Sequence, residues 1–269
     1  MSWRYTGEFA QVTHCHCALC RKAHGAAFGT YAVGPLEPFE YLSGAEAIAE
    51  YESSPGFIRS FCRHCGSVLP NTKLGEIVAI PFGLADVGNQ IAVDAHIYVA
   101  AKASWYEITD SLLQHDYYPD QTAPVVTTPK KTSATDSIQG SCLCGEVAFE
   151  LKSEFKAVHH CHCSRCRKAR AAAHSTNGIN EIPALRFTRG GSNVKAFFLE
   201  GAEFFGQAFC KTCGSAMPRI DEGRDISITP LGALDGSPRR LPDDHIYVAS
   251  KADWFEITDD LKQFPSKPG

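Results

Sequence analysis

The cysteines are the residues of this chain whose type and spacing could do chemistry. All twelve fall into short clusters with the spacings typical of metal ligands. Two clusters have the pattern Cys-x-Cys-x-x-Cys, and we call them the first and second triplet. The first triplet is Cys15, Cys17 and Cys20, and the second is Cys161, Cys163 and Cys166. The remaining cysteines form three pairs, Cys62 with Cys65, Cys142 with Cys144, and Cys210 with Cys213.

Disulfide bonds and buried apolar cysteines are the alternatives to metal binding. The segment Met1–Cys15 has no apolar run of the length found in signal peptides, so we expect a cytoplasmic protein with reduced thiols. Cysteines two positions apart also rarely bridge one another. Buried apolar cysteines would not explain why the spacing repeats. The pattern therefore predicts zinc sites.

Composition narrows the range of partners. The chain has 269 residues, of which 44% are hydrophobic, and a formal net charge of −4. No stretch approaches the ~20 consecutive apolar residues that a membrane-spanning helix needs. The mixed, mildly acidic charge lacks the basic surface typical of nucleic-acid binding. We therefore expect a small-molecule ligand and neither a membrane nor a nucleic acid as partner.

The chain contains an internal repeat. Eight of the ten residues at 14–23 are identical at 160–169, and thirteen of the seventeen at 96–112 recur at 245–261. Such similarity indicates two copies of one domain and not a short-period solenoid. We place the copies at 1–118 and 138–269. The segment 119–137, rich in Thr, Ser, Pro and Lys, is predicted to be a linker.

Short strands dominate the expected secondary structure. Residues 146–151 alternate between polar and apolar side chains, and 77–82 and 225–230 are predicted to be equivalent strands ending near a proline. Frequent Gly and Pro favour a mainly β domain with many turns. The exceptions are 21–27 and 167–173, where one or two helical turns are expected after each triplet.

The cysteine counts predict two kinds of zinc site. Two pairs of the second copy, Cys142 with Cys144 and Cys210 with Cys213, supply the four thiolates of a closed structural site. Each triplet supplies only three ligands and leaves one position for water or substrate. Three thiolates on zinc give a net charge of −1, which suits an incoming thiol that must stay nucleophilic better than it suits hydroxide.

Two alternatives stay open at the second triplet. A histidine, either His160, His162 or His174, could close it as a structural Cys₃His site. Arg167 and Lys168, which follow Cys166, could attract a carboxylate of the substrate or could be solvated residues on a short helix. Arg21 and Lys22 occupy the same positions after the first triplet. All four are candidates for binding the carboxylates of the thiol co-substrate.

The combined motifs resemble the glutathione-dependent formaldehyde-activating enzyme family, which also includes centromere protein V. The resemblance covers essentially the whole chain, as two copies, and implies a zinc-binding β-tent fold of short antiparallel sheets with few short helices. The residues that carry it are 140–145, 161–168, 209–214 and 245–248, together with Trp254.

The resemblance also implies roles for the cysteines. Cys142, Cys144, Cys210 and Cys213 would hold the structural zinc, and each triplet would hold a reactive zinc. The activity implied is that of a carbon–sulfur lyase-type enzyme, which joins glutathione to formaldehyde or another small aldehyde. A non-catalytic scaffold that binds zinc and thiols is the alternative.

Each copy departs from the family pattern in its own way. Met1 aligns opposite Val147, so the first copy lacks the opening Cys-x-Cys, and Cys62 and Cys65 have only two of four ligands. We predict that this pair holds no tightly bound zinc; one hypothesis is that the natural gene starts upstream with the missing pair. The second copy has His174 where the first has Phe28.

Overall fold

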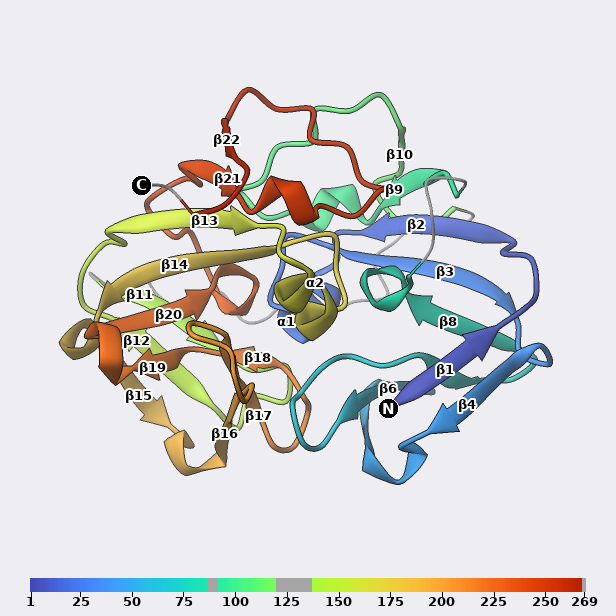
Figure 1. Ribbon diagram of the computed structural model, residues 1–269, viewed down its shortest axis with the longest axis horizontal. Coiled ribbons are helices and arrows are strands. Elements are labelled where there is room, and N and C mark those ends of the chain that lie inside the picture. Colours follow the sequence, from blue (N-terminus) through green and yellow to red (C-terminus); the bar gives the residue numbers. More distant parts are fainter. Residues whose placement is uncertain (87–90, 120–136, 268–269) are drawn as a thin grey trace.

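The computed structural model describes residues 1–86, 91–119 and 137–267, so most of the predicted linker at 119–137 lies outside the described residues. Each half builds a six-stranded sheet of its own (Figure 1). In spatial order the first sheet contains β10 (Leu113–Gln114), β9 (Ala95–Ile97), β2 (Gln11–Cys15), β3 (Gly29–Pro35), β8 (Ile77–Pro81) and β7 (Asn71–Leu74). The second contains β19 (Arg219–Asp221), β20 (Ile226–Pro230), β14 (Ser175–Glu181), β13 (Ala157–Cys161), β21 (Asp244–Ile246) and β22 (Lys262–Phe264).

Smaller sheets surround these two. In the first half they are β1 (Ser2–Tyr5) with β4 (Phe39–Ser43), and β5 (Ile48–Ser54) with β6 (Phe57–Cys62). In the second half they are β11 (Ile138–Ser141), β12 (Ala148–Leu151) and β15 (Leu185–Arg189), and β16 (Val194–Phe198), β17 (Gly206–Cys210) and β18 (Ala216–Met217). The mainly β prediction is confirmed, and the strands expected at 77–82, 146–151 and 225–230 are β8, β12 and β20. Besides the expected antiparallel pairs, β9 runs parallel to β2 and β21 runs parallel to β13.

In each half, one short α-helix begins directly after the second cysteine of the triplet. Both helices begin slightly earlier in the chain than predicted. They are α1 (Ala18–His24) and α2 (Ser164–Arg170). Each begins where a cysteine Sγ accepts a hydrogen bond from a backbone N–H, and each ends at a residue in the left-handed conformation. Single 3₁₀ turns occur at η1 (Ala45–Ala47), η2 (Phe82–Leu84), η3 (Val99–Ala101), η4 (Ile182–Ala184), η5 (Gly191–Asn193), η6 (Glu222–Arg224), η7 (Leu231–Ala233) and η8 (Val248–Ser250).

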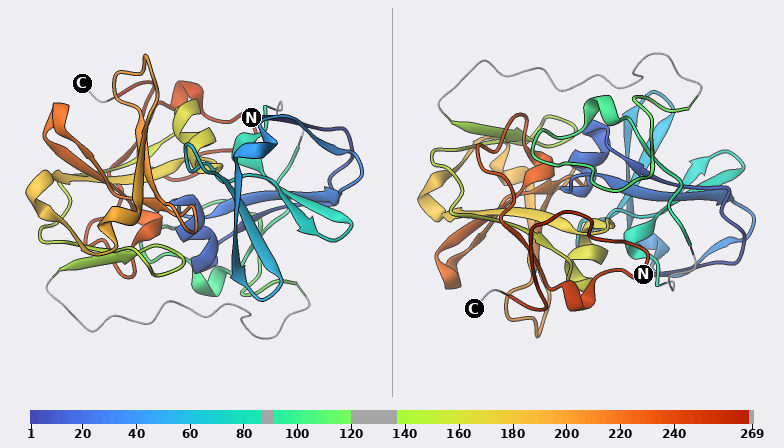
Figure 2. Two further views of the ribbon diagram at one scale, coloured as in Figure 1. Left: turned by 90° about the horizontal axis from the view of Figure 1, so that it is seen from below. Right: turned by 90° about the horizontal axis from the view of Figure 1, so that it is seen from above.

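The halves lie side by side (Figure 2) and pack against each other through these helices. In Figure 1, α1 and α2 both lie near the centre of the molecule, at the boundary between the halves. Helix α1 contacts η7 of the second half, and α2 contacts η2 of the first. One hydrophobic cluster runs through both halves, beside two smaller clusters in the first half; Phe28, Phe82 and Trp254 are among its members. Burial of this shared apolar surface stabilises the pairing of the halves.

Equivalent lysines on the two helices make ion pairs across the interface. Lys22 on α1 lies 2.6 Å from Asp235, and Lys168 on α2 lies 2.8 Å from Asp86. The side chains of the first pair are 5% and 9% exposed, whereas those of the second are 46% and 72% exposed. Lys22 also donates to the carbonyl and hydroxyl oxygens of Ser141. The two halves are thus joined asymmetrically.

No helix among the described residues is long and apolar enough to cross a membrane.

We predict that Lys22→Met lowers the free energy of unfolding by about 3 kcal/mol, because it leaves the Asp235 carboxylate buried without its cation. Lys168→Met is the matched control and should cost less than about 1 kcal/mol, because its pair is solvated. Urea unfolding followed by circular dichroism measures both. Equal losses of unfolding free energy in the two variants would contradict the claim that the buried ion pair contributes more to stability than the exposed one.

Candidate metal centres

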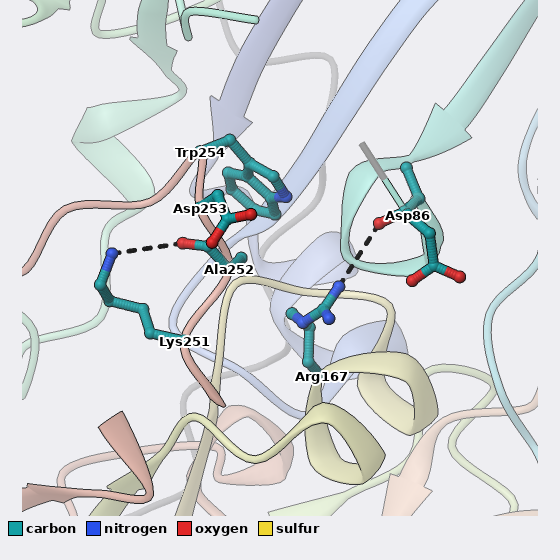
Figure 3. Close-up of a pocket in the computed structure, with 7 residues that line it drawn as sticks. Asp86, Arg167, Lys251, Ala252, Asp253 and Trp254 are labelled. Atoms are coloured by element: carbon teal, nitrogen blue, oxygen red, sulfur yellow. Dashed lines mark hydrogen bonds between the residues drawn. The ribbon is translucent and has the colours of Figure 1, made fainter. Parts of the chain in front are cut away.

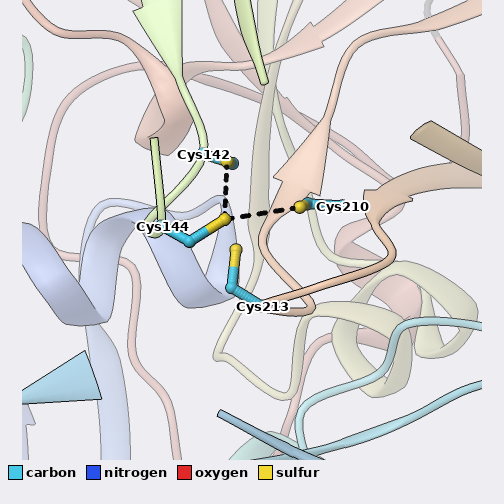
Figure 4. Close-up of side chains that lie close together, drawn as sticks. All are labelled: Cys142, Cys144, Cys210 and Cys213. Atoms are coloured by element: carbon cyan, nitrogen blue, oxygen red, sulfur yellow. Dashed lines mark hydrogen bonds between the residues drawn. The ribbon is translucent and has the colours of Figure 1, made fainter. Parts of the chain in front are cut away.

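Four cysteines of the second half converge on one point (Figure 4). Cys142 and Cys144 lie in the turn between β11 and β12, and Cys210 and Cys213 lie at the end of β17 and in the turn that follows. All four Sγ atoms lie within 4.8 Å of one another. The Sγ of Cys144 is 3.3 Å from that of Cys142 and 3.7 Å from that of Cys210. The two pairs, far apart in the sequence, therefore form one cluster.

The donor set of this cluster fits a tetrahedral metal ion. Zinc–sulfur bonds of ~2.3 Å place the sulfurs about 3.8 Å apart, close to the spacing found here. Hydrogen-bond donors also face the sulfurs: the backbone N–H of Val147 lies 3.2 Å from Cys142 Sγ, and Asn193 Nδ2 lies 3.5 Å from Cys210 Sγ. Donors of this kind stabilise thiolates. The four cysteines could hold a metal ion that staples two distant turns together.

The equivalent pair of the first half, Cys62 and Cys65, forms the same turn as Cys210 and Cys213. It is not part of a four-cysteine cluster among the described residues. The backbone N–H of Cys62 donates to Ser67 over 2.9 Å, just as that of Cys210 donates to Ser215. Among the described residues, no third cysteine, histidine or carboxylate joins the pair in a possible metal site. That it binds no zinc of its own stays a prediction.

Contact with the other half supports this turn. Gly66 adopts φ +75°, and a Cβ there would lie 2.3 Å from Phe209 Cγ. Gly214 adopts φ +71°, and a Cβ there would lie 2.4 Å from Phe61 Cγ. The two turns therefore pack glycine against phenylalanine across the interface, and Gln207 donates to the carbonyl oxygen of Cys65. Only glycine permits both the backbone conformation and this close approach.

Each triplet is built by the end of a strand and the helix that follows. Cys15 ends β2 and Cys161 ends β13, whereas the third cysteine of each triplet lies in α1 or α2. In both triplets the three Sγ atoms lie within 4.8 Å of one another. The backbone N–H of the third cysteine donates to the second over 3.3 Å, both from Cys20 to Cys17 and from Cys166 to Cys163. Each triplet could therefore hold a metal ion.

The triplets differ in accessibility. Cys15, Cys17 and Cys20 are 7%, 4% and 5% exposed, so the first triplet is buried, although its ligand count predicts a position open to water or substrate. Leu19, Tyr31 and Tyr98 cover it. In the second triplet Cys161 is buried, but Cys163 and Cys166 are partly exposed. A molecule from solvent can reach the second triplet more readily than the first.

Within each triplet one thiol is acidic. Hydrogen bonds from Cys161 and Cys166 lower the pKa of Cys163 to about 3, and those from Cys15 and Cys17 hold the pKa of Cys20 well below its usual value. At neutral pH each cluster therefore carries negative charge, which favours a cation.

The histidine between the first two cysteines of each triplet is held by a second histidine and an aspartate. His16 Nε2 lies 2.8 Å from His96 Nδ1, and His96 Nε2 lies 3.0 Å from Asp110. Burial lowers the pKa of His96, against the opposing charge of Asp110, so the ring is neutral. Because Asp110 accepts, His96 donates from Nε2 and accepts from His16 at Nδ1. The second half repeats this arrangement with His162, His245 and Asp259 at 2.8 and 3.0 Å.

Histidine does not close either triplet among the described residues. No described histidine nitrogen lies within 4.8 Å of all three sulfurs of a triplet. His174 instead packs its ring 4.6 Å from that of His160 and 5.1 Å from that of His162. Burial lowers the pKa of His174 to about 3, so it is neutral. The described residues therefore do not form the Cys₃His alternative.

A buried arginine lies against the first triplet. Arg59 comes from β6, and its Nη2 donates to the Sγ of Cys20 over 3.6 Å. Burial alone would lower the pKa of Arg59, but the negative charge that Cys20 acquires raises it instead. The guanidinium therefore stays cationic and compensates the charge that the thiols acquire when they ionise.

Hydrogen bonds continue from Arg59 into the other half. Arg59 Nη1 lies 3.4 Å from Tyr31 Oη, which lies 2.7 Å from His24 Nε2, and His24 Nδ1 lies 2.6 Å from the carbonyl oxygen of Arg170. A carbonyl only accepts, so His24 donates from Nδ1. Burial lowers the pKa of His24 to about 4, so its Nε2 accepts from Tyr31 at neutral pH. The chain links the first triplet to α2, which carries Cys166.

The second half has none of these side chains at the equivalent positions. The replacements are Arg170 for His24, Asn177 for Tyr31 and Gln207 for Arg59. Burial lowers the pKa of Arg170 to about 10, although the charge of Cys166 opposes the shift. Each triplet thus has a buried arginine near its third cysteine, supplied by a strand in the first half and by a helix in the second.

The four basic residues proposed as carboxylate ligands all have protein partners. Arg21 donates to the carbonyl oxygens of His16 and Ala101 in its own half. Lys22, Arg167 and Lys168 instead reach residues of the other half. Lys22 is enclosed by oxygen acceptors at the interface. That these four basic residues bind the carboxylates of glutathione stays a prediction.

Sequence reasoning did not single out Arg59 or the histidine–aspartate pairs. The pairs lie in a long block of high identity between the repeats, 96–112 and 245–261, which is a signal that could have indicated them. Arg59 gave no such signal, because its equivalent is Gln207 and only the fold brings β6 to the triplet.

Comparison with known proteins agrees with the repeat. Two segments of the chain, residues 1–101 and 137–250, match the sequence profile of the family described as "Glutathione-dependent formaldehyde-activating enzyme". The crystal structure of a Rhodobacter sphaeroides protein shares 25% sequence identity with this chain at a TM-score of 0.30, and the match covers 39% of this chain and 98% of that one. No curated protein matches the chain.

We predict that Arg59→Gln weakens metal binding at the first triplet about tenfold or more, because a hydrogen bond between charged groups contributes ~1.5–3 kcal/mol. Titration with Co²⁺, followed by its thiolate charge-transfer absorption, measures this in a Cys166→Ser background that disables the second triplet, after the four-cysteine cluster has been filled with zinc. Arg59→Lys retains the positive charge and should lose less Co²⁺ affinity than Arg59→Gln. An unchanged Co²⁺ affinity in Arg59→Gln would refute the role of the guanidinium.

Proposed function

The chain belongs to the glutathione-dependent formaldehyde-activating enzyme family, and on that premise we propose that it is a zinc-dependent carbon–sulfur lyase-type enzyme. Its substrates in this proposal are adducts of glutathione, or of a similar thiol, with formaldehyde or another small aldehyde. The observation that carries the proposal is the second triplet, in which three thiols converge and two of them, those of Cys163 and Cys166, are partly open to solvent.

The metal in this proposal is zinc. Thiolates are soft ligands that favour zinc over hard cations, and four of them form a closed structural site. Cys142, Cys144, Cys210 and Cys213 would hold the structural ion, and each triplet would hold one more. Zinc on the second triplet would lower the pKa of an incoming thiol and keep it as a thiolate.

The chain's own residues position and shield the reacting groups. Three thiolate ligands leave one position free, and the partial exposure of Cys163 and Cys166 gives the thiol a route to it. His162, held by His245, fixes the loop between Cys161 and Cys163. Correct placement of sulfur and aldehyde then supplies most of the acceleration.

The reaction needs no oxidant or reductant. In the direction of adduct formation, the thiol sulfur forms a bond to the carbonyl carbon, and the carbonyl π electrons move to oxygen. The proton released by the thiol ends on that oxygen, which gives an S-hydroxymethyl product in the case of formaldehyde. The lyase direction breaks the same carbon–sulfur bond and returns the proton to sulfur.

The first triplet suits a different task. Its burial and the hydrogen bond from Arg59 favour a metal ion that stabilises the fold, or one that binds thiols without turnover. This is the role of the non-catalytic scaffold, which we assign to the first half only.

Matched cysteine variants test the proposal. Cys166→Ser should abolish the acceleration of exchange between formaldehyde and S-hydroxymethylglutathione, because it removes a ligand of the reactive site. Cys20→Ser, the equivalent change in the first half, should retain much more of the acceleration. Exchange spectroscopy by NMR measures the rate, and circular dichroism checks that both variants are folded. Full activity in Cys166→Ser would overturn the proposal.

A further inference from the structure

Arg170, the last residue of α2, carries a buried positive charge without a partner in the protein. The residue is 8% exposed, and its guanidinium makes no hydrogen bond or ion pair with any described residue. None of its unpartnered nitrogens is closed to solvent, so the unused donors remain open to a ligand. A buried charge that lacks a partner is costly, which indicates that a ligand supplies the missing anion.

The guanidinium lies next to the accessible triplet. Arg170 follows Cys166 by four positions in α2, and residues four apart lie on the same face of a helix, with their Cβ atoms ~6 Å apart. Burial lowers the pKa of Arg170, and the charge of Cys166 opposes the shift. Because Cys166 is itself partly exposed, a thiol that reaches the second triplet comes close to Arg170.

The end of α1 holds Arg170 in place. His24 Nδ1 donates to the carbonyl oxygen of Arg170 over 2.6 Å. A Cβ on Gly25 would lie 3.4 Å from Arg170 Nη1, so the guanidinium reaches the last turn of the first half's helix. The first half therefore orders this cation before any ligand arrives, which lowers the entropic cost of binding.

A second buried arginine adds to the positive charge at this place. Arg219, which begins β19, is 9% exposed, and its charge acts on both Arg170 and Cys166. Arg219 donates to Asp221 over 3.1 Å and to the carbonyl oxygen of Phe204 over 2.9 Å. Asp221 also accepts from Arg224. One carboxylate thus serves two arginines, and no described carboxylate serves Arg170.

Compensation of the thiolate charge is the alternative role for Arg170. Arg59 compensates such charge in the first half, where its Nη2 donates to Cys20 Sγ over 3.6 Å. Arg170 makes no such bond to Cys166. Its donors are therefore left for another acceptor, whereas those of Arg59 are directed at the thiols.

The first half lacks this pair of arginines. His24 stands at the position of Arg170, and Asn71 stands at the position of Arg219. The strand pairing supports the second equivalence, because Asn71 lies opposite Ala79 just as Arg219 lies opposite Ile228. The pair of cations belongs to the half whose triplet is accessible.

The neighbouring arginine, Arg167, has partners within the protein. It lines a hollow of about 290 Å³ between the halves (Figure 3). There its Nη1 donates to the carbonyl oxygens of Gly83 over 3.3 Å and Ala85 over 3.4 Å, and its Nε is closed to solvent. Of the two arginines, Arg170 is thus the one without an acceptor.

We infer that Arg170 binds a carboxylate of the thiol substrate beside the second triplet, with Arg219 adding a second positive charge to the site. A guanidinium with free donors suits a carboxylate, because two parallel N–H groups can donate to its two oxygens. The inference rests on the proposed function for the identity of the thiol. It makes Arg170 a determinant of specificity, which favours thiols with a carboxylate over neutral ones.

S-Methylglutathione tests this carboxylate site apart from the thiol chemistry, because it keeps both carboxylates and its blocked sulfur cannot become a thiolate. Isothermal titration of the zinc-loaded protein should detect its binding. Its dimethyl ester, which lacks the charged carboxylates, should bind about tenfold more weakly or worse. Arg170→Gln should abolish this difference by raising the Kd of the acid and leaving that of the ester unchanged.

Arg165→Gln is the matched control, because it removes the same charge from an exposed position of α2 and should keep the difference between acid and ester. Thermal unfolding checks that each variant is folded. Arg170→His, which places the first half's residue at this position, replaces Arg170→Gln if that variant does not fold, and it should abolish the difference as well.

Three results would overturn the inference: no binding of S-methylglutathione, equal Kd values for acid and ester in the unaltered protein, or an unchanged difference in the Arg170 variant. Loss of the difference in Arg165→Gln would also overturn it, since the effect would then come from the general charge of the helix. If exchange activity is absent while the acid still binds through Arg170, only the proposed reaction is refuted.

Discussion

The contact between the two halves is the constraint on which the rest of the structure depends. Helices α1 and α2 each carry a cysteine of a triplet, and each is also pressed against a turn of the other half. The buried pair of Lys22 and Asp235 fixes this arrangement at a point where an unpaired charge would be costly. Any shift of one half would therefore move the ligands of a metal site in the other.

This contact explains how two copies of one domain come to differ. In the first half, the hydrogen-bonded chain from Arg59 to His24 ends on the carbonyl oxygen of Arg170, and the triplet is enclosed. In the second half, Arg170 lies in the helix itself, and Cys163 and Cys166 keep some exposure. Both triplets carry a buried cation nearby, which a cluster of thiolates needs in a low-dielectric interior. A shared electrostatic requirement is met in two ways.

Much of this could be predicted from the sequence, because cysteine spacing and the repeat are local patterns. The four-cysteine cluster and the separate convergence of each triplet followed from ligand counting, and the strand at 146–151 followed from alternation. Burial of the first triplet did not follow, since Arg59 and Tyr31 reach it only after folding. Lys22 looked like a solvated or ligand-binding cation, because nothing in its own helix indicates Asp235, more than 200 positions away. Pairing between halves is a long-range property that local patterns do not encode.

The central claim is that the second triplet accepts an external thiol and the first does not. A crystal structure of the zinc-loaded protein with glutathione, with zinc located by anomalous scattering, tests it most directly. The account predicts the glutathione sulfur ~2.3 Å from the zinc held by Cys161, Cys163 and Cys166, and no such sulfur at Cys15, Cys17 and Cys20. Glutathione bound through sulfur at the first triplet, or at neither, would contradict it.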